Sequence, residues 1–390
     1  MQDIMTRPRG RHHPHATRLA QATGALDPGR DPPGEGRSYL QRILRSGNAM
    51  TKGSPTTVRT IAMPRKITLH VFASAKGGVG KSTLAVTCAK LLAEGRDRLP
   101  IVVDADMTGT SLADGLRLLA PNTTLLSDGT VDIEAAPTGR FLSREEVKRL
   151  RRLRRDSKDK RGLPPPFLND ALRPFLLGKA EELKDPRIDA LLWRHEADDD
   201  VWYLPSSALR EDVVECLRWF ALEPYDWMGA MTVVLHRLSV QWPEVSDVVV
   251  DLPPGLFGFG AEMLQLASAI QRRELPEGYP DWTSGDVVWD ARVYVVTTPD
   301  DNDLLPVYEN VVLQARTFRS AHILVNKSVA PPPRPAEIVG ETLGVLIDER
   351  RIHQVPLLTP TLGRIFVDGA LRVDDDVRRL ATLFTSEVVA

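Results

Sequence analysis

The stretch SAKGGVGKSTL, residues 74–84, has the residue types that bind phosphate groups. Its glycines let backbone N–H groups turn toward an oxyanion without a Cβ in the way. Lys81 can reach the terminal phosphates of a nucleotide, and the hydroxyl of Ser82 can bind Mg²⁺. The residues expected to bind the phosphates are Ala75, Lys76, Gly77, Gly78, Val79, Gly80, Lys81, Ser82 and Thr83.

Two positions set this loop apart from the general phosphate-loop pattern G-x-x-x-x-G-K-[ST]. The pattern requires glycine where this chain has Ala75, and an additional lysine, Lys76, comes directly after it. The context still supports the motif, because an apolar run precedes the loop and a helical pattern begins near Lys81. The partial positive charge of that helix start favours an anion. The sequence therefore predicts a phosphate site in which Lys76 needs a separate explanation.

The wording KGGVGKST resembles the deviant Walker A loop of the ParA/MinD superfamily of ATPases. In that family the first pattern position is free and a signature lysine follows it, as Lys76 does here. The resemblance implies that Lys76 reaches across a dimer interface to the phosphates bound by a second copy. A cation supplied in this way stabilises the transferred phosphoryl group only when two loaded subunits face each other. Lys76 and Lys81 are therefore both candidate catalytic residues.

Three carboxylates follow from the same resemblance. VVDADMTGTSL, residues 102–112, resembles the switch segment of the family, and DVVVDLPPG, residues 247–255, resembles its Walker B strand. The resemblance implies that Asp106 orients the attacking water, that Asp251 holds Mg²⁺, and that Asp104 lies near the metal shell. These roles suit phosphoryl transfer, which depends on positioning the nucleophile more than on a strong base.

The resemblance also implies which residue contacts the adenine base, and it raises one alternative activity. ILVNKSV, residues 323–329, resembles the strand that contacts the base, so Asn326 is expected to bind adenine. An asparagine at a strand end can equally cap the next turn, and both interpretations stay open. DLPPG is most similar to a branch that includes iron–sulfur carriers. That branch uses a CxxC pair, whereas this chain has only Cys88 and Cys216, which are far apart.

The elements that must position these residues follow from the alternation of apolar β-branched runs with amphipathic stretches. This alternation predicts an α/β fold: a doubly wound, mainly parallel P-loop NTPase sheet with helices on both faces. Predicted strands cover residues 66–74, 100–106, 200–207, 247–253, 291–299, 321–327 and 342–348. Predicted helices cover residues 81–95, 208–220, 224–240, 259–273, 302–318 and 374–386. The seven tryptophans, Trp193 to Trp289, are expected to pack in the core and at its rim.

One region interrupts this alternation, and we expect a helical insertion at residues 120–199. It contains the basic run SREEVKRLRRLRRDSKDKRG, residues 143–162. The arginines could neutralise DNA phosphates or dock an acidic protein, as the resemblance to DNA-binding ParA members implies. A charge run is also typical of a solvated helix face, so these interpretations stay open.

Residues 1–65 are expected to form a disordered basic extension before an ATPase domain at 66–390. Residues 1–66 hold 12 Lys and Arg against four Asp and Glu, whereas the whole chain of 390 residues has a net charge of -2. The extension is a second candidate contact for DNA or an acidic partner, or simply a solvated arm. With two cysteines and no long apolar run, we expect a cytoplasmic protein without a membrane span. Its C-terminal helical stretch begins with three aspartates and its apolar residues are expected to pack in the core, so we expect no membrane binding.

The resemblance implies Mg²⁺-dependent ATP hydrolysis coupled to an ATP-gated homodimer, with ATP and Mg²⁺ as ligands. Such a switch would position, partition or regulate a macromolecular partner, and turnover should be slow and stimulated by that partner. Two alternatives remain: an ATP-dependent carrier or maturation factor, and a regulatory interaction protein with negligible turnover. The intact Asp106 favours hydrolysis over the latter.

Overall fold

The structure is a computed structural model, and it describes the chain in several separate ranges. It comprises residues 64–94, 98–107, 112–119, 123–125, 131–133, 167–169, 171–172, 192–195, 197–207, 209–222, 226–274, 286–318, 320–358, 364–369 and 375–385. The expected N-terminal extension and the arginine run at 143–162 lie outside these residues.

A nine-stranded sheet forms the centre of the described part, with the strand order β11-β10-β9-β1-β8-β2-β7-β6-β3. Its strands are β1 (Arg65–Ser74), β2 (Leu99–Asp104), β3 (Leu118–Leu119), β6 (Trp193–His195), β7 (Asp198–Leu204), β8 (Val245–Asp251), β9 (Val287–Thr297), β10 (His322–Val325) and β11 (Ile352–Gln354). Strands β11 through β7 pair in parallel, and β6 and β3 extend one edge antiparallel. The predicted doubly wound, mainly parallel sheet is therefore confirmed.

The first strand lies in the middle of the sheet, between β9 and β8. Its register pairs Phe72 with Asp251 on β8 and Ser74 with Val296 on β9. Both neighbours run parallel to β1, so their carboxyl ends reach the same edge as the end of β1. This topology brings the glycine-rich loop, which follows Ser74, next to the acid that ends β8.

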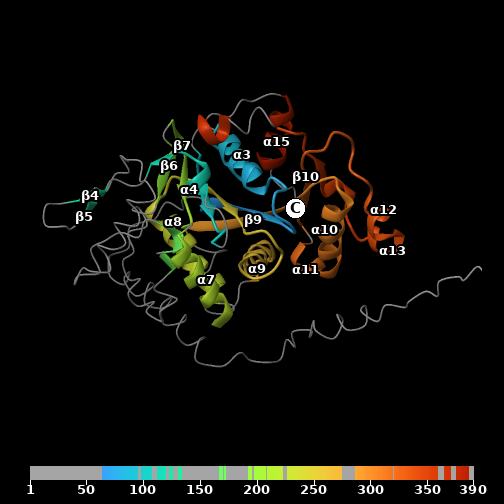
Figure 1. Cartoon of the computed structure of the whole chain (residues 1–390), viewed down its shortest axis with the longest axis horizontal. Coiled ribbons are helices and arrows are strands. Elements are labelled where there is room, and N and C mark those ends of the chain that lie inside the picture. The colour runs from blue at the N-terminus through green and yellow to red at the C-terminus, as the bar shows by residue number, and fades with distance from the viewer. Residues whose placement is uncertain are drawn as a thin grey trace, which may run out of the picture.

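Helices cover both faces of the sheet (Figure 1). The helices α3 (Lys81–Ala93) and α15 (Asp375–Thr385) pack on one face, together with Phe72 and Val249. On the other face lie α7 (Arg210–Leu222), α8 (Asp226–Gln241), α9 (Phe259–Arg272) and α10 (Asp301–Leu313). The remaining helices are short: α4 (Leu112–Gly115), α11 (Ala315–Phe318), α12 (Pro335–Val339), α13 (Glu341–Gly344) and the 3₁₀ turn Glu349–Arg351.

Burial on both faces explains why the central strands are apolar throughout. Val248, Val249 and Val250 on β8 are all fully buried, although their side chains point alternately to opposite faces. Each fully buried valine contributes roughly 1.5–3 kcal/mol relative to exposure. Six tryptophans lie in the described part, and each is buried or packs against the core, which confirms the expected packing role for those six.

The predicted strand at 342–348 is wrong. Those residues instead begin as the helix α13, which packs closely on α12: a Cβ at Gly344 would lie 2.5 Å from the backbone of Ala336. Val345 and Leu346 are 75% and 65% exposed, so the apolar run that suggested a buried strand is largely solvent-facing. The edge strand of the sheet is β11, a few residues later.

The expected helical insertion at 120–199 also needs correction in its described part. Three short strands lie within it: β6, and the antiparallel pair β4 (Thr123–Leu125) and β5 (Val131–Ile133). Residues 168–169 and 171–172 are helical, and Leu168 and Leu172 join the main core. The described pieces of this region are therefore mixed in secondary structure, and β6 and the start of β7 belong to the central sheet.

No helix of the described residues is both long and apolar enough to cross a membrane.

Candidate nucleotide-binding site

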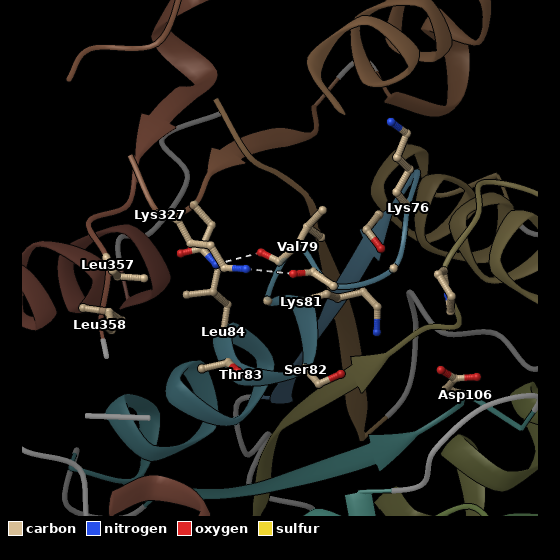
Figure 2. Close-up of a pocket in the computed structure, with 16 residues that line it drawn as sticks. Lys76, Val79, Lys81, Ser82, Thr83, Leu84, Asp106, Lys327, Leu357 and Leu358 are labelled. Carbon is tan, nitrogen blue, oxygen red and sulfur yellow. Dashed lines mark hydrogen bonds between the residues drawn. The ribbon is translucent and has the colours of Figure 1, made fainter. Parts of the chain in front are cut away.

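A cavity of about 520 Å³ lies at the carboxyl ends of the central strands, around the glycine-rich loop (Figure 2). Its size falls within the range of small-molecule sites. Ten of the predicted site residues line it: Lys76, Gly77, Gly78, Val79, Gly80, Lys81, Ser82, Thr83, Asp106 and Asn326. The structure thus brings together residues that lie as far as 250 positions apart in the chain.

Backbone geometry explains the glycines of the loop. Gly78 and Gly80 have φ values of 79° and 91°, which favour glycine over any residue with a Cβ. A Cβ at Gly80 would also lie 2.3 Å from the Nδ2 atom of Asn326. Gly80 directly precedes α3, so the loop leads the backbone into the start of this helix. The cavity consequently faces the end of α3 that favours anions.

Lys81 forms a buried ion pair with Asp251, from Nζ to Oδ1. The exposures of the two side chains are 7% and 2%. Because β8 lies beside β1, Asp251 reaches the start of α3 although it follows Lys81 by 170 residues. Each charge compensates the other where water is excluded. Asp251 itself does not line the cavity, whereas its partner Lys81 does.

Lys76 lies at the opposite end of the loop and has a different partner. Its Nζ is 3.0 Å from Oδ1 of Asp303, in the first turn of α10, and the two side chains are 46% and 21% exposed. Asp303 also accepts a hydrogen bond from Thr298 Oγ1 at 2.6 Å. That hydrogen bond, followed by the contact with Lys76, lowers the pKa of Asp303. Figure 2 shows Lys76 pointing away from Lys81 and Asp106.

Asp104 is buried and accepts hydrogen bonds at both oxygens. The backbone N–H of Asp106 donates to Oδ1 at 3.1 Å, and that of Leu112 donates to Oδ2 at 2.8 Å. Ser206, in the loop after β7, donates from Oγ to Asp104 Oδ2 at 2.7 Å and to the Asp106 carbonyl at 3.1 Å. Asp104 does not line the cavity. These hydrogen bonds let Asp104 anchor the switch segment, and its expected position near the metal shell stays a prediction.

Asn326 and Lys327 follow β10 and hold the glycine-rich loop from the other side. Asn326 Nδ2 donates to the Val79 carbonyl at 2.8 Å, and Lys327 Nζ donates to the Gly78 carbonyl at 2.8 Å. Lys327 has a φ of 60°, which turns the chain sharply after the strand. Asn326 therefore contacts the loop directly in this structure, in addition to lining the cavity.

The residues present fit a nucleotide with Mg²⁺. The space beside Gly78 is open, since a Cβ there would meet no atom within 4 Å. Ser74 lines the cavity and its buried Oγ has no hydrogen-bond partner among the described residues, so a ligand can supply one. Ser82 lines the same cavity, and Asp251 lies directly behind Lys81, with which it forms an ion pair. Hydroxyl and carboxylate oxygens are the ligands that Mg²⁺ prefers.

Several residues of this site were not identified from the sequence. They are Asp303, Ser206, Lys327, Pro254, Leu357 and Leu358. Ser206 and Asp303 each follow a strand by only a few residues, which is a usable signal, because the carboxyl ends of parallel strands share one edge. Nothing in the sequence pattern specifies their partners. Ala75, in contrast, was expected at the site but packs against the core.

The chain is similar to several solved structures at low sequence identity. It is 14% identical to a ParA family ATPase from Chlorobium tepidum TLS, with 76% of this chain and 87% of that chain covered and a TM-score of 0.41. It is also 14% identical to the septum site-determining protein MinD from Pyrococcus horikoshii OT3, complexed with Mg-ADP, with 82% of this chain and 89% of that chain covered and a TM-score of 0.40. It is 13% identical to a variant of McdA from Cyanothece in complex with ATP, with 84% of this chain and 100% of that chain covered and a TM-score of 0.44. A comparison with curated proteins found no match.

A family model, described as the CobQ/CobB/MinD/ParA nucleotide binding domain, matches residues 70–357. The matched stretch covers well over half of the chain and includes the glycine-rich loop, Asp106, Asp251 and Asn326. The parallel sheet and the loop between β1 and α3 agree with the P-loop NTPase fold of that family. The chain belongs to the CobQ/CobB/MinD/ParA family of nucleotide-binding domains.

Proposed function

We propose that this protein is a Mg²⁺-dependent ATPase that acts as an ATP-gated homodimeric switch. The family supports nucleotide binding, and the loop, cavity and carboxylates supply the groups that phosphoryl transfer requires. The observation that carries the dimer is the placement of Lys76. This lysine belongs to the phosphate loop, yet its ammonium pairs with Asp303 and points away from its own Lys81.

The buried end of the loop binds the substrate. Lys81 and the loop amides hold the β- and γ-phosphates, while Ser82 and Asp251 provide oxygen ligands for the metal. Bound Mg²⁺ would neutralise negative charge on these phosphates. Lys81 then exchanges part of its contact with Asp251 for the phosphate oxygens, and the buried carboxylate keeps a cationic partner throughout.

Asp106 orients the attacking water from across the cavity. Its backbone is fixed by Asp104, which accepts from the Asp106 N–H, and by Ser206, which donates to the Asp106 carbonyl. Asp104 and Ser206 are both buried, so the backbone that carries the Asp106 carboxylate is fixed before substrate binds. Such preorganisation matters because a misplacement of about 1 Å can cost a factor of about 100 in rate.

Lys76 completes the site of a second copy. An ion pair as exposed as Lys76 with Asp303 contributes only about 0–1 kcal/mol, so exchanging Asp303 for a partner's phosphate costs little. The phosphate charge becomes available only when both copies hold ATP. Dimer formation therefore reports nucleotide occupancy, and hydrolysis removes the group that Lys76 contacts.

We propose that the switch positions, partitions or regulates a macromolecular partner. The candidate contacts are the basic run at 143–162 and the N-terminal extension, with DNA or an acidic protein as the partner. Deleting residues 143–162 and comparing retention on DNA with capture of acidic proteins separates these two classes.

Light scattering tests the dimer. The Asp106→Ala variant should trap ATP, so its mass should double when MgATP is added, and the additional Lys76→Ala change should abolish the doubling. Arg334→Ala, which removes an exposed cation paired with Glu337, serves as the matched control. A mass that ignores ATP, although ATP binds, would rule out the ATP-gated homodimer.

A second measurement separates an ATPase from an assembly switch without turnover. Phosphate release by the full chain at saturating MgATP should exceed that of Asp106→Ala, while both bind nucleotide equally. If neither releases phosphate, hydrolysis is wrong and the regulatory alternative replaces it.

A further inference from the structure

A second polar hollow lies at the amino ends of the central strands, at the opposite edge of the sheet from the nucleotide cavity. It has a volume of about 90 Å³ and is lined by residues of β1, β8 and β9 and by the end of α15. Its charged or titratable lining residues are Lys66, His70, Arg98, Asp247 and Arg292. His70, the β1 residue of the hollow that is nearest to the nucleotide cavity, precedes Ser74 by four residues, which separates the two sites by roughly 13 Å along the strand.

The most buried cation of this hollow is Arg292, on β9, whose exposure is only 7%. Its Nη1 donates to the Phe384 carbonyl at 2.6 Å, near the end of α15. Among the described residues, its buried Nε has no hydrogen-bond partner and no carboxylate pairs with its guanidinium group. A carbonyl offsets only part of a guanidinium charge. A buried charge without a counter-ion is costly, so an anion in the hollow would stabilise it.

The remaining charges of the hollow do not supply that anion. Asp247 accepts from His70 Nε2 at 3.1 Å and from Ser246 Oγ at 2.7 Å, and it faces Arg98 at 3.8 Å. Lys66 pairs with Asp290, which lies outside the hollow, at 3.3 Å. Two carboxylates therefore face three cations, and the charge left over is that of Arg292.

The surroundings of His70 agree with this excess of positive charge. Burial lowers its pKa most, Asp247 partly offsets that effect, and Arg292 and Arg98 lower it further. His70 therefore stays neutral near pH 7, with one ring nitrogen bonded to Asp247. It adds no charge of its own to the three cations.

We propose that this hollow binds one free inorganic phosphate ion. The volume of about 90 Å³, against about 520 Å³ for the nucleotide cavity, suits a small tetrahedral oxyanion better than a nucleotide. Two guanidinium groups and an ammonium match the charge and geometry of a phosphate dianion. The Ser246 and Thr385 side chains line the same space, but their hydroxyls already donate to Asp247 and to the Ala381 carbonyl, so the three cations provide the contacts to the ion. The site is independent of the proposed ATPase activity.

The test must exclude the phosphate loop, which also binds phosphate. The full chain is saturated with Mg²⁺ and the non-hydrolysable analogue AMPPNP, which fills every phosphate position of the nucleotide cavity. Binding of radiolabelled inorganic phosphate is then measured by equilibrium dialysis up to about 5 mM. We expect one phosphate per chain in addition to the nucleotide.

Exposed members of the hollow provide variants that leave the fold intact. Arg98→Ala and Lys66→Ala should each weaken phosphate binding by about tenfold or more, the loss expected for one charged hydrogen bond. Arg350→Ala, an equally basic change at an exposed site away from the hollow, should leave binding unchanged. Arg292→Met should abolish binding, provided that its circular dichroism matches that of the wild type.

Two outcomes would overturn the proposal. One is the absence of phosphate binding to the AMPPNP-saturated chain. The other is binding that Arg98→Ala and Lys66→Ala leave unchanged, which would place the ion elsewhere. The Arg98 and Lys66 variants decide the matter even if Arg292→Met fails to fold.

Discussion

The two ends of the glycine-rich loop carry the same kind of contact in different surroundings. At the C-terminal end of the loop, Lys81 pairs with Asp251, and both side chains are almost fully buried. At its beginning, Lys76 pairs with Asp303, and the lysine is about half exposed. Both are lysine–aspartate pairs formed by distant segments, and both bring a residue of the same short loop to a neighbouring strand or helix.

Burial gives these two pairs opposite properties. Removing one member of a buried pair leaves a charge without water or partner, which makes Lys81 and Asp251 a fixed unit. An exposed pair competes with water and is worth little, so Lys76 can change partners at small cost. The loop thus combines a rigid substrate-binding end with an end suited to contact a second copy.

The largest effect should come from breaking the buried pair. Lys81→Met or Asp251→Asn alone should lower the free energy of unfolding by about 3–5 kcal/mol, because each leaves its partner uncompensated. The double variant should lose clearly less than the sum of the two. Urea unfolding without nucleotide measures all three. Strictly additive losses would mean that the two charges do not compensate each other.

Asp106→Asn should lower ATP turnover by about 100-fold, because an amide orients water less well than a carboxylate. Nucleotide binding should change little, since Asp106 lies across the cavity from the glycine-rich loop. Turnover and binding of a fluorescent ATP analogue are measured on the same preparation. Unchanged turnover would remove Asp106 from the mechanism.

Acid should destabilise the contact between His322 and His353, whose burial lies between that of the Lys81–Asp251 pair and that of the Lys76–Asp303 pair. His322 Nδ1 and His353 Nε2 are 2.9 Å apart, and burial, then His353, Arg351 and Arg292, lower the pKa of His322 from 6.5 to about 4. The unfolded chain therefore binds more protons between those values. The free energy of unfolding should be fully retained above pH 6.5 and fall by about 1–2 kcal/mol as the pH drops to 4.

Denaturant unfolding at several pH values checks this dependence. His322→Asn keeps a polar side chain that does not titrate, so its stability should fall less steeply over the same range. Parallel curves for the wild type and this variant would show that His322 is not responsible.

Ser206→Ala should lower kcat by about tenfold with little change in KM, because Ser206 positions Asp106 and does not line the nucleotide cavity. Ser207→Ala is the matched control, since its Oγ donates to Asp212 and not to the switch segment. Steady-state phosphate release separates the two parameters. Equal effects of both variants would indicate a general structural cause.

The smallest effect should come from the exposed pair. Asp303→Asn should change the free energy of unfolding by less than about 1 kcal/mol and lower the ATP concentration needed for dimer formation by about two- to fivefold, since Lys76 is released. Asp301→Asn removes another acid from the same first turn of α10 and controls for the helix dipole. A loss of dimer in Asp303→Asn alone would mean that Asp303 supports the assembly.

The central strands were predictable because burial on both faces leaves few sequence patterns open. The runs at Arg65–Ser74 and Val245–Asp251 are bounded within two residues of the predicted limits. The edges were not predictable in this way. Apolar Val345 and Leu346 imitate a strand, but the close contact of Gly344 with Ala336 favours a short helix there. At edges, tertiary packing outweighs local pattern.

The family, the central α/β architecture and the glycine-rich loop could be predicted from the sequence, because they depend on local chemistry: glycines for close approach, Lys81 and Ser82 for phosphate and metal. The partners of these residues became visible in the folded chain alone. It put Asp303 beside Lys76, and Ser206 beneath Asp104 and Asp106, because separate strands end at one edge of the sheet. It also gathered Lys66, Arg98 and Arg292 at the opposite edge. Such pairings arise from strand order, which no local pattern encodes.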